Sequence, residues 1–241
     1  EPRTMPEMEI RALTFDVFGT VVDWRNSIAR EGATWGPKKG LEIDWFAFAD
    51  AWRGLYQPAM EKVREDQMGW VNLDALHRMN LNQLSDQFGL GGLSETDLKH
   101  LNQIWHRLDP WPDAVAGMER LKQKFTLASL SNGNVALIVN MAKRARIPWD
   151  MVLGAEVAGH YKPQPEAYSI SVGLLGLEPQ QALMVAAHNG DLVAAAAVGL
   201  RTAFVRRPTE YGPNQDFDFD PKHKFDFVAE DFLDLADQLD C

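Results

Sequence analysis

Cysteine and long apolar runs are both scarce in this sequence. Cys241 is the only cysteine among 241 residues, so neither an internal disulfide nor a cysteine zinc cluster can form. This scarcity favours a reducing, cytoplasmic setting. No apolar run approaches the roughly 20 residues that a spanning helix needs, so we expect no membrane association. Residues 1–12 mix charges with prolines and have no apolar core, so we expect no secretory signal there.

Positive charge is also in short supply. Lys and Arg together number 24 against 34 Asp and Glu, which gives a formal net charge of −10. A chain this acidic is a poor candidate for binding nucleic acid or an anionic membrane surface, although a few local cations can still hold a small anion. The length and the 46% share of hydrophobic residues suffice for one large α/β domain, or for one domain with a sizeable insertion.

The first part of the chain contains one strand followed by a long helical stretch. Residues 10–17, IRALTFDV, are an apolar run rich in strand formers that ends at the break FGT. From Trp24 to about Arg107, apolar side chains recur at helical spacing and no strand is indicated. The segment 108–115, LDPWPDAV, is a proline-marked boundary.

After this boundary, strand and helix patterns alternate to the end of the chain. Strands are predicted at 125–131, 151–157, 182–187 and 201–206 and in FDFVAE, and helices at 135–145, 165–177, 191–200 and in the final DFLDLADQL. This alternation indicates a parallel sheet with helices on both faces. We therefore predict an α/β fold with a doubly wound, Rossmann-like parallel-sheet core at 8–22 and 109–241. A helical cap at 23–108 interrupts this core after its first strand.

Asp16, a polar residue at the end of a buried strand, is a candidate nucleophile. Within DVFGTVVD, Gly19 permits a tight turn, and Thr20 can donate a hydrogen bond to the carboxylate. A carboxylate held in this way can form a covalent ester. The alternative is an aspartate that caps a helix or a turn, the commonest fate of a lone aspartate after a strand. Ligands of a doubly wound sheet bind beyond the carboxyl ends of its strands, where Asp16, Ser131, Lys162 and the AHNGD stretch converge.

Four motifs in register resemble those of the haloacid dehalogenase superfamily. FDVFGTVVD resembles the first motif, LSNGN the second with Ser131, and YKPQPEAY the third with Lys162. AAHNGDL falls where the fourth, acidic motif is expected, with Asp191. The resemblance covers nearly the whole chain and includes the helical insertion. It implies a hydrolase in which Asp16 is the nucleophile, Lys162 neutralises its surroundings and Asp191 holds the attacking water.

Within this superfamily, the chain most resembles the 2-haloacid dehalogenase branch. The phosphatases carry a second aspartate two positions after the nucleophile, where this chain has Phe18, and an apolar ring suits a carbon electrophile better. The branch needs no metal, and we expect neither a metal nor a cofactor. The resemblance assigns Arg53 of the cap and Asn132 to the departing halide and places Tyr168 in the same site. The alternative for Arg53 is a solvated helix face.

The fourth motif departs from this branch, which typically has SSN, two further residues and Asp. Here Ala186 replaces the serine that handles the lysine and water, His188 replaces the asparagine, and Gly190 replaces an aromatic that often borders the halide. We expect His188 to be catalytic, one turn before Asp191, and to fit the site to a small leaving group such as fluoride. The alternative is a helix-start histidine whose ring satisfies a backbone group.

The predicted reaction is hydrolytic dehalogenation of a small 2-haloacid, with fluoroacetate among the candidates, to a 2-hydroxy acid through an aspartyl ester. The predicted catalytic residues are Asp16, Lys162, Asp191, Arg53 and His188, and the predicted substrate-binding residues are Thr20, Ser131, Asn132, Tyr168 and Asn189. Ser131 and backbone amides are expected to bind the substrate carboxylate.

Three rival hypotheses stand beside this reaction. They are a ring-opening hydrolase of azetidine-2-carboxylate, a Mg²⁺-dependent phosphatase and a catalytically silent binding protein on the same fold. The last conflicts with the cost of burying Asp16, Lys162 and Asp191 without use. Dimers are common in this branch, so a homodimer is one expected state.

Overall fold

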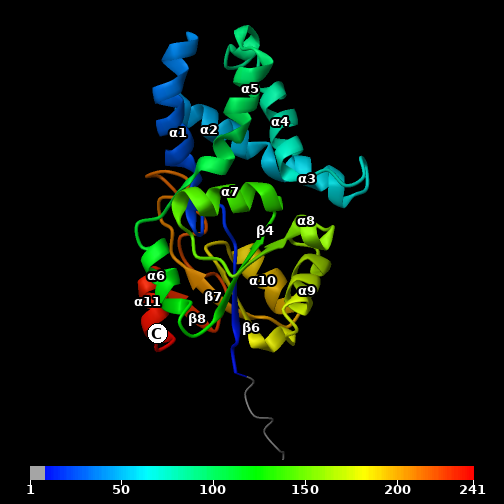
Figure 1. The fold of residues 1–241 in the computed structure, drawn as a ribbon, viewed down its shortest axis with the longest axis vertical. Helices are drawn as coiled ribbons and strands as arrows, with labels where there is room; N and C mark the ends of the chain where they lie inside the picture. The colour runs from blue at the N-terminus through cyan, green and yellow to red at the C-terminus, as the bar shows by residue number, and fades with distance from the viewer. Residues whose placement is uncertain (1–8) are drawn as a thin grey trace, which may run out of the picture.

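The described part of the chain, residues 9–241 of a computed structural model, is built around a six-stranded sheet (Figure 1). Its strands are β1 (Ala12–Phe15), β4 (Thr126–Ser131), β5 (Met151–Gly154), β6 (Ala182–Ala186), β7 (Arg201–Val205) and β8 (Phe227–Ala229). They lie in the order β5-β4-β1-β6-β7-β8, and every neighbouring pair is parallel. The strand order reverses at β1, which makes its carboxyl end the expected ligand site of a doubly wound sheet. The predicted fold class is confirmed.

Residues 1–8 are not described. We expect no secretory signal in residues 1–12, and most of these residues lie outside the described ones. The first residue of the predicted core segment 8–22 also lies outside them. Within residues 9–241, no helix combines the length and the apolar character needed to cross a membrane.

Helices cover both faces of the sheet. They are α6 (Ala114–Leu121), α7 (Val135–Ala145), α8 (Ala155–Ala158), α9 (Pro165–Leu174), α10 (Asn189–Ala197) and α11 (Phe232–Gln238), with a 3-10 turn at Pro179–Gln181. Leu13 and Phe15 pack in one apolar cluster with side chains of α6, α7 and α11. Thr14 lies between them and contacts Met184 in the second cluster, which α9 and α10 cover. Alternate side chains of β1 therefore pack into the two apolar clusters on opposite faces of the sheet, as expected for a parallel sheet that is buried on both faces.

One predicted strand is wrong at its C-terminal end. The strand predicted at 151–157 stops at Gly154, and the following residues form the helical turn α8. Gly154 has a φ of +136°, and the backbone oxygen of Ser131 lies 2.0 Å from the place where a Cβ would stand. Only glycine fits this approach, so the chain turns away from the sheet beside Ser131. Sequence periodicity carries no information on such a close contact between two backbones.

The predicted helical stretch forms a cap above the core (Figure 1). Its helices are α1 (Trp24–Trp35), α2 (Trp45–Gly54), α3 (Tyr56–Arg64), α4 (Leu73–Gln83) and α5 (Glu95–Asn102), with 3-10 segments at Gly36–Lys39, Leu90–Gly92 and Gln103–Arg107. Helix α2 begins at the cap residue Asp44, whose carboxylate accepts hydrogen bonds from two backbone N–H groups. The apolar side chains that recur at helical spacing in α2 and α3 are all buried, as this spacing predicts. They are Trp45, Phe48, Trp52, Tyr56 and Met60.

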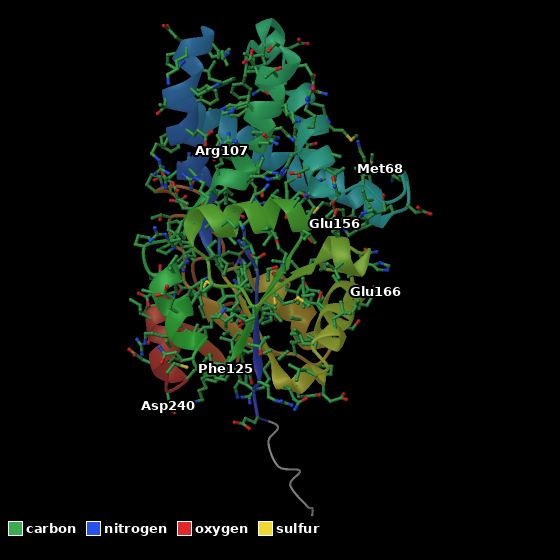
Figure 2. The ribbon with its side chains drawn as sticks, in the orientation of Figure 1. Met68, Arg107, Phe125, Glu156, Glu166 and Asp240 are labelled. Carbon is green, nitrogen blue, oxygen red and sulfur yellow. The ribbon has the colours of Figure 1, made fainter. Side chains whose placement is uncertain are left out.

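The cap lies over the carboxyl ends of the core strands. The chain leaves the core through β2 (Val22–Asp23) and returns through β3 (Asp109–Pro110), and these two short strands pair antiparallel. Figure 2 shows Arg107 in the cap, whereas Phe125, which precedes β4, lies at the opposite end of the core. The carboxyl ends of the strands are thereby shielded from solvent.

Arg207 anchors the loop that follows β7. Its side chain is buried, and its guanidinium donates two parallel hydrogen bonds to the Asp113 carboxylate, at 2.8 and 2.9 Å, and a third to the Thr20 carbonyl. Burial opposes ionisation of Asp113, but Arg207 outweighs it and lowers the pKa of that carboxyl. Bidentate geometry of this kind fixes both partners. The loop after β7 is therefore held close to the turn that follows Asp16.

Replacing Arg207 by alanine is expected to lower the free energy of unfolding by about 3 kcal/mol, because Asp113 is left without its cation. Urea unfolding at neutral pH measures this change. The control is Arg206→Ala, whose ion pairs with Asp220 and Glu230 are exposed and are expected to contribute less than about 1 kcal/mol. Equal losses in the two variants would contradict the anchoring role of Arg207.

Candidate active site

A cavity of about 690 Å³ lies between the cap and the carboxyl ends of the strands. Its walls include seven of the predicted site residues: Asp16, Arg53, Asn132, Lys162, Tyr168, His188 and Asp191. These residues come from the cap, from three strand ends, from the loop between α8 and α9, and from two core helices. The topology brings them together because all the strands of the sheet point the same way.

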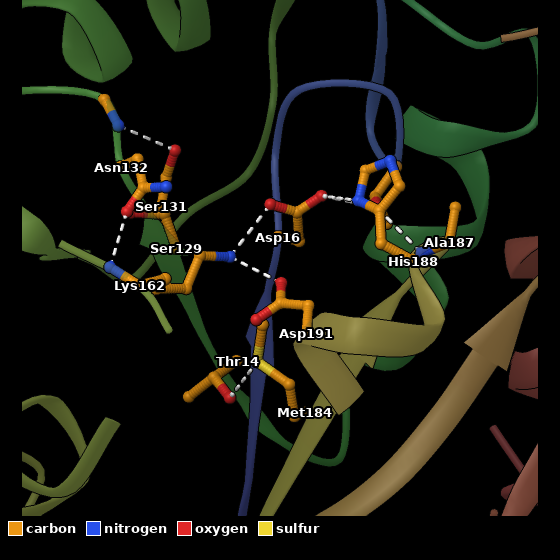
Figure 3. Close-up of polar contacts among 12 residues, drawn as sticks. Thr14, Asp16, Ser129, Ser131, Asn132, Lys162, Met184, Ala187, His188 and Asp191 are labelled. Carbon is orange, nitrogen blue, oxygen red and sulfur yellow. Dashed lines mark hydrogen bonds and ion pairs between the residues drawn. The ribbon is translucent and has the colours of Figure 1, made fainter. Parts of the chain in front are cut away.

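Asp16 is held as an ionised carboxylate at the bottom of this cavity. The Thr20 hydroxyl donates a 2.7 Å hydrogen bond to Oδ2. The Lys162 ammonium donates a 2.9 Å bond to Oδ1 (Figure 3). Thr20 is itself fixed, because its hydroxyl oxygen accepts a hydrogen bond from the backbone N–H of Ala187. Burial opposes ionisation, but Lys162 and His188 outweigh it and hold the pKa of Asp16 well below its usual range. A carboxylate of this kind is available as a nucleophile at neutral pH.

Lys162 lies between two carboxylates. Its ammonium is 2.9 Å from Asp16 and 2.5 Å from Oδ2 of Asp191. Burial alone would favour a neutral amine, but the two carboxylates outweigh it and raise the pKa of Lys162 above its ordinary value. The Tyr168 hydroxyl donates a 2.5 Å hydrogen bond to Oδ1 of Asp191, and burial together with that carboxylate raises the pKa of the phenol, which stays protonated. Both oxygens of Asp191 therefore already accept short hydrogen bonds.

Arg53 reaches the cavity from α2 of the cap. Its guanidinium lies 4.1 Å from the ring centroid of Tyr56 and 5.4 Å from that of Trp24, so it is not on a solvated helix face. Its buried Nη1 has no hydrogen-bond partner within residues 9–241. Arg53 lines the cavity, and a buried cation with an unused donor is suited to an anion.

Asn132 is fixed by its backbone surroundings. Its side-chain oxygen accepts a 2.8 Å hydrogen bond from the backbone N–H of Lys162. This bond orients the side chain, since the oxygen is the only acceptor of an amide. The amino group of Asn132 takes no part in this bond, and Asn132 and Arg53 both line the cavity.

Three predicted substrate-binding residues surround the cavity without lining it. Ser131 is buried, and its hydroxyl oxygen accepts a hydrogen bond from the backbone N–H of Gly133. Asn189 holds the loop after β7, because its side chain bonds Asp218, the Asp220 carbonyl and the Lys222 N–H. Thr20 contacts Asp16 rather than the open space. The structure thus gives these side chains supporting contacts, which motif position alone could not distinguish from contacts with substrate.

His188 lies against Asp16 on the side opposite Lys162 (Figure 3). Its Nδ1 is 3.1 Å from Oδ2 of Asp16, and its Nε2 is 2.8 Å from Oε2 of Glu210. The ring does not cap helix α10, so the backbone-satisfying alternative is excluded. Burial favours the neutral ring, but Glu210 and Asp16 outweigh it and raise the pKa of His188 well above 6.5. Because both nitrogens face carboxylates, the ring is committed to them rather than open to a halide.

Glu210 and Tyr211 are site residues that the sequence did not indicate. Both come from the loop after β7, Glu210 is 1% exposed, and Tyr211 lines the cavity. The indole N–H of Trp24 donates a 3.0 Å hydrogen bond to Oε1 of Glu210. Neither residue belongs to a motif with characteristic spacing, and only their position after a strand end offered a signal.

Replacing Lys162 by methionine is expected to remove turnover and to change how stability depends on pH. In the parent protein the folded-state pKa of Asp16 lies below the unfolded value of 3.8, so its contribution is present at neutral pH and lost on acidification. Without Lys162, the positive charge that lowers the pKa of Asp16 is gone and the neighbouring carboxylate of Asp191 opposes its ionisation, so the pKa of Asp16 rises. Acidification from about pH 7 to about pH 4 should then cost less stability than in the parent.

Urea unfolding of the parent and of Lys162→Met at the two pH values tests whether acidification costs the variant less stability. Lys143→Met, which removes an exposed lysine, is the control and should keep the parent's pH dependence. The same pH dependence in all three proteins would contradict the proposed charge arrangement.

Comparisons with known proteins agree with this geometry. The family model of haloacid dehalogenase-like hydrolases matches residues 10–199. The crystal structure of an L-2-haloacid dehalogenase is 48% identical, with a TM-score of 0.93 over 96% of this chain and 99% of that one. That of a defluorinating L-2-haloacid dehalogenase is 45% identical, with a TM-score of 0.94 over 96% of each chain. (S)-2-haloacid dehalogenase 4A of Burkholderia cepacia is 26% identical over 232 residues, which cover 92% of this chain and 93% of that protein. The resemblance predicted from the four motifs is confirmed, and this chain belongs to the haloacid dehalogenase-like hydrolase family.

Proposed function

We propose that this chain hydrolyses the carbon–halogen bond of small 2-haloacids and releases 2-hydroxy acids. The observation that carries the proposal is that one cavity is lined by an ionised Asp16 and by Arg53, whose buried Nη1 has no hydrogen-bond partner within residues 9–241. The first is a nucleophile for carbon, and the second is a receptor for the halide that leaves.

In the first step, a carboxylate oxygen of Asp16 attacks the carbon that bears the halogen. The new carbon–oxygen bond forms as the carbon–halogen bond breaks, and the electron pair leaves with the halide. Arg53 and the amino group of Asn132 stabilise the charge that develops on the halide, a term typically worth about 3 kcal/mol for each well-placed donor. Lys162 holds the nucleophile in place and keeps Asp191 compatible with it.

In the second step, water hydrolyses the ester on Asp16. The oxygen of water bonds to the ester carbonyl carbon, the bond to the substrate oxygen breaks, and the 2-hydroxy acid leaves. One proton is released per turnover, since water supplies two protons and the hydroxy acid retains one. Asp191 and His188 both border Asp16 and are the groups available to hold this water.

The names of the relatives suggest the stereochemistry and the range of halides. The two similar crystal structures are those of enzymes named for L-2-haloacids, one of them defluorinating, and the Burkholderia enzyme is named for (S)-2-haloacids. We therefore expect (S)-2-chloropropionate to be consumed in preference to its enantiomer, and fluoroacetate to be among the substrates.

The rival activities find less support in the site. Phe18 occupies the position of the phosphatase acid, is buried, and packs edge-on against Tyr56, His77 and Trp105. A ring embedded in this way leaves no proton donor for a phosphate leaving group. None of the three relatives compared above is named for ring opening of azetidine-2-carboxylate. The cytoplasmic location and the homodimer remain predictions.

The test of the first step is a single turnover with excess enzyme in ¹⁸O-labelled water. The label should appear in the peptide that contains Asp16 before it appears in the product, because water attacks the ester at the Asp16 carbonyl carbon. Mass spectrometry of the digested enzyme measures this incorporation. Label in the product alone would mean that water attacks the substrate directly and would overturn the assignment of Asp16.

Activity is expected to survive exhaustive treatment with EDTA, because the Lys162 ammonium already supplies positive charge between Asp16 and Asp191. Halide release from fluoroacetate, chloroacetate and both 2-chloropropionates, measured with and without chelator, checks this. Azetidine-2-carboxylate and a phosphate monoester serve as comparison substrates. Loss of activity that Mg²⁺ restores, or turnover of only a comparison substrate, would reject the proposed function.

A further inference from the structure

Glu210 is a buried carboxylate that the two-step reaction leaves without a role. It is 1% exposed, lies outside the four motifs, and faces the ring of His188 at 2.8 Å. Its other oxygen accepts the indole N–H of Trp24 from the start of the cap. Burial of a carboxylate is costly unless its partners compensate for the lost water. Core, cap and loop thus all contribute to placing this one group.

The turn after Asp16 is shaped to admit Glu210. A Cβ on Gly19 would stand 2.0 Å from Oε1 of Glu210, and Gly19 has a φ of +86°, which favours glycine. Arg207, three residues before Glu210, fixes the loop to the Thr20 carbonyl of the same turn. The approach of Glu210 therefore depends on two independent features, the missing side chain of Gly19 and the hydrogen bond from the Arg207 side chain to the turn.

Hydrolysis of the ester on Asp16 needs a group that accepts a proton from water. Lys162 is protonated, and both oxygens of Asp191 already accept hydrogen bonds of 2.5 Å, from Lys162 and Tyr168. His188 remains, with Nδ1 at hydrogen-bond distance from the carboxyl group that is to be hydrolysed. A nitrogen in that place is within reach of a water that attacks the carbonyl carbon.

We propose that His188 is the general base of the hydrolytic step and that Glu210 is the positioning residue that orients its ring and stabilises the imidazolium. This inference rests on the proposed function and refines its second step. The arrangement is a carboxylate, an imidazole and a reacting group in line, in which the carboxylate fixes the tautomer and the orientation of the ring. Nε2 faces Glu210, so Nδ1 is the nitrogen that exchanges a proton with the reacting water.

The proton balance closes over one turnover. In the resting enzyme His188 is protonated between Asp16 and Glu210. Formation of the ester removes the charge of Asp16, which lowers the pKa of His188, and the ring proton leaves the site as the halide departs. The neutral ring then takes a proton from water as the water oxygen bonds to the carbonyl carbon.

The product half of the step restores the resting state. When the bond between the carbonyl carbon and the substrate oxygen breaks, His188 returns its proton to that oxygen, and the 2-hydroxy acid leaves. The remaining proton of water passes from Asp16 to His188, which restores a carboxylate and an imidazolium. The charged and titratable groups around the ring are Asp16, Glu210, Tyr211, Arg53 and, beyond Asp16, Lys162 and Asp191.

The test separates the two steps in Glu210→Gln by rapid quench with (S)-2-chloropropionate. Chloride release in the first turnover should stay within about threefold of the parent, whereas hydrolysis of the ester should slow by about 10- to 100-fold. The ester should therefore accumulate and appear by mass spectrometry on the Asp16 peptide. The control is Glu230→Gln, which changes an exposed glutamate directly after strand β8 and should behave as the parent.

The pH dependence distinguishes positioning from mere support of the fold. The hydrolytic step should slow at acid pH as His188 is protonated, and this acid limb should move to lower pH in Glu210→Gln, because the carboxylate raises the pKa of the ring. Glu210→Asp keeps the charge but shortens the side chain, so it should slow hydrolysis with a smaller displacement of the limb. Either glutamate variant that retains the chloride burst is sufficiently folded for the test.

The outcomes separate this inference from the proposed function. Normal ester hydrolysis in both glutamate variants would overturn the proposed roles of His188 and Glu210, and so would equal slowing of both steps with an unmoved acid limb. Neither result would affect the proposed dehalogenase function. No chloride burst and no labelled Asp16 in the parent enzyme would overturn the proposed function itself. Accumulated ester in Glu210→Gln together with a displaced limb supports both.

Discussion

The ammonium of Lys162, enclosed between Asp16 and Asp191, is the interaction on which the rest of the site depends. Two carboxylates this close to one buried point would repel each other and take up protons if no cation separated them. With Lys162 in place, Asp16 stays ionised and Tyr168 can donate to the far oxygen of Asp191. The charge that a nucleophile requires is thus compatible with the burial that keeps bulk water away from the reacting carbon.

From this centre, positive and negative groups alternate in a continuous series of contacts. Lys162, Asp16, His188 and Glu210 follow one another at 2.9, 3.1 and 2.8 Å, and Trp24 closes the series from the cap. Each charged group contacts a neighbour of opposite charge, so no charge in the series is buried without a partner. The series also joins three parts of the chain that are remote in sequence, which ties formation of the site to docking of the cap on the core.

Much of the fold and part of the site could be predicted from local pattern. The strand run that ends at Asp16, the alternation after the boundary and the range of α7 follow from periodicity, which depends only on neighbouring residues. The end of β5 could not be predicted, because Gly154 turns there to meet the backbone of Ser131. Ser131 and Asn189 belong to the right motifs, but whether their side chains face the cavity depends on the loops that they hold in place.

The sequence alone determined the α/β class, the place of the cap and the family, because each is carried by periodicity or by a motif with fixed internal spacing. It also indicated Asp16, Lys162 and Asp191, since each belongs to a motif that lies beyond the carboxyl ends of the strands, where a doubly wound sheet binds its ligands. Only the tertiary structure decided what faces His188. Glu210 comes from a loop without periodicity, and its place depends on the anchoring of Arg207, the missing side chain of Gly19 and the indole of Trp24. These are long-range contacts, and no local pattern in a single sequence encodes them.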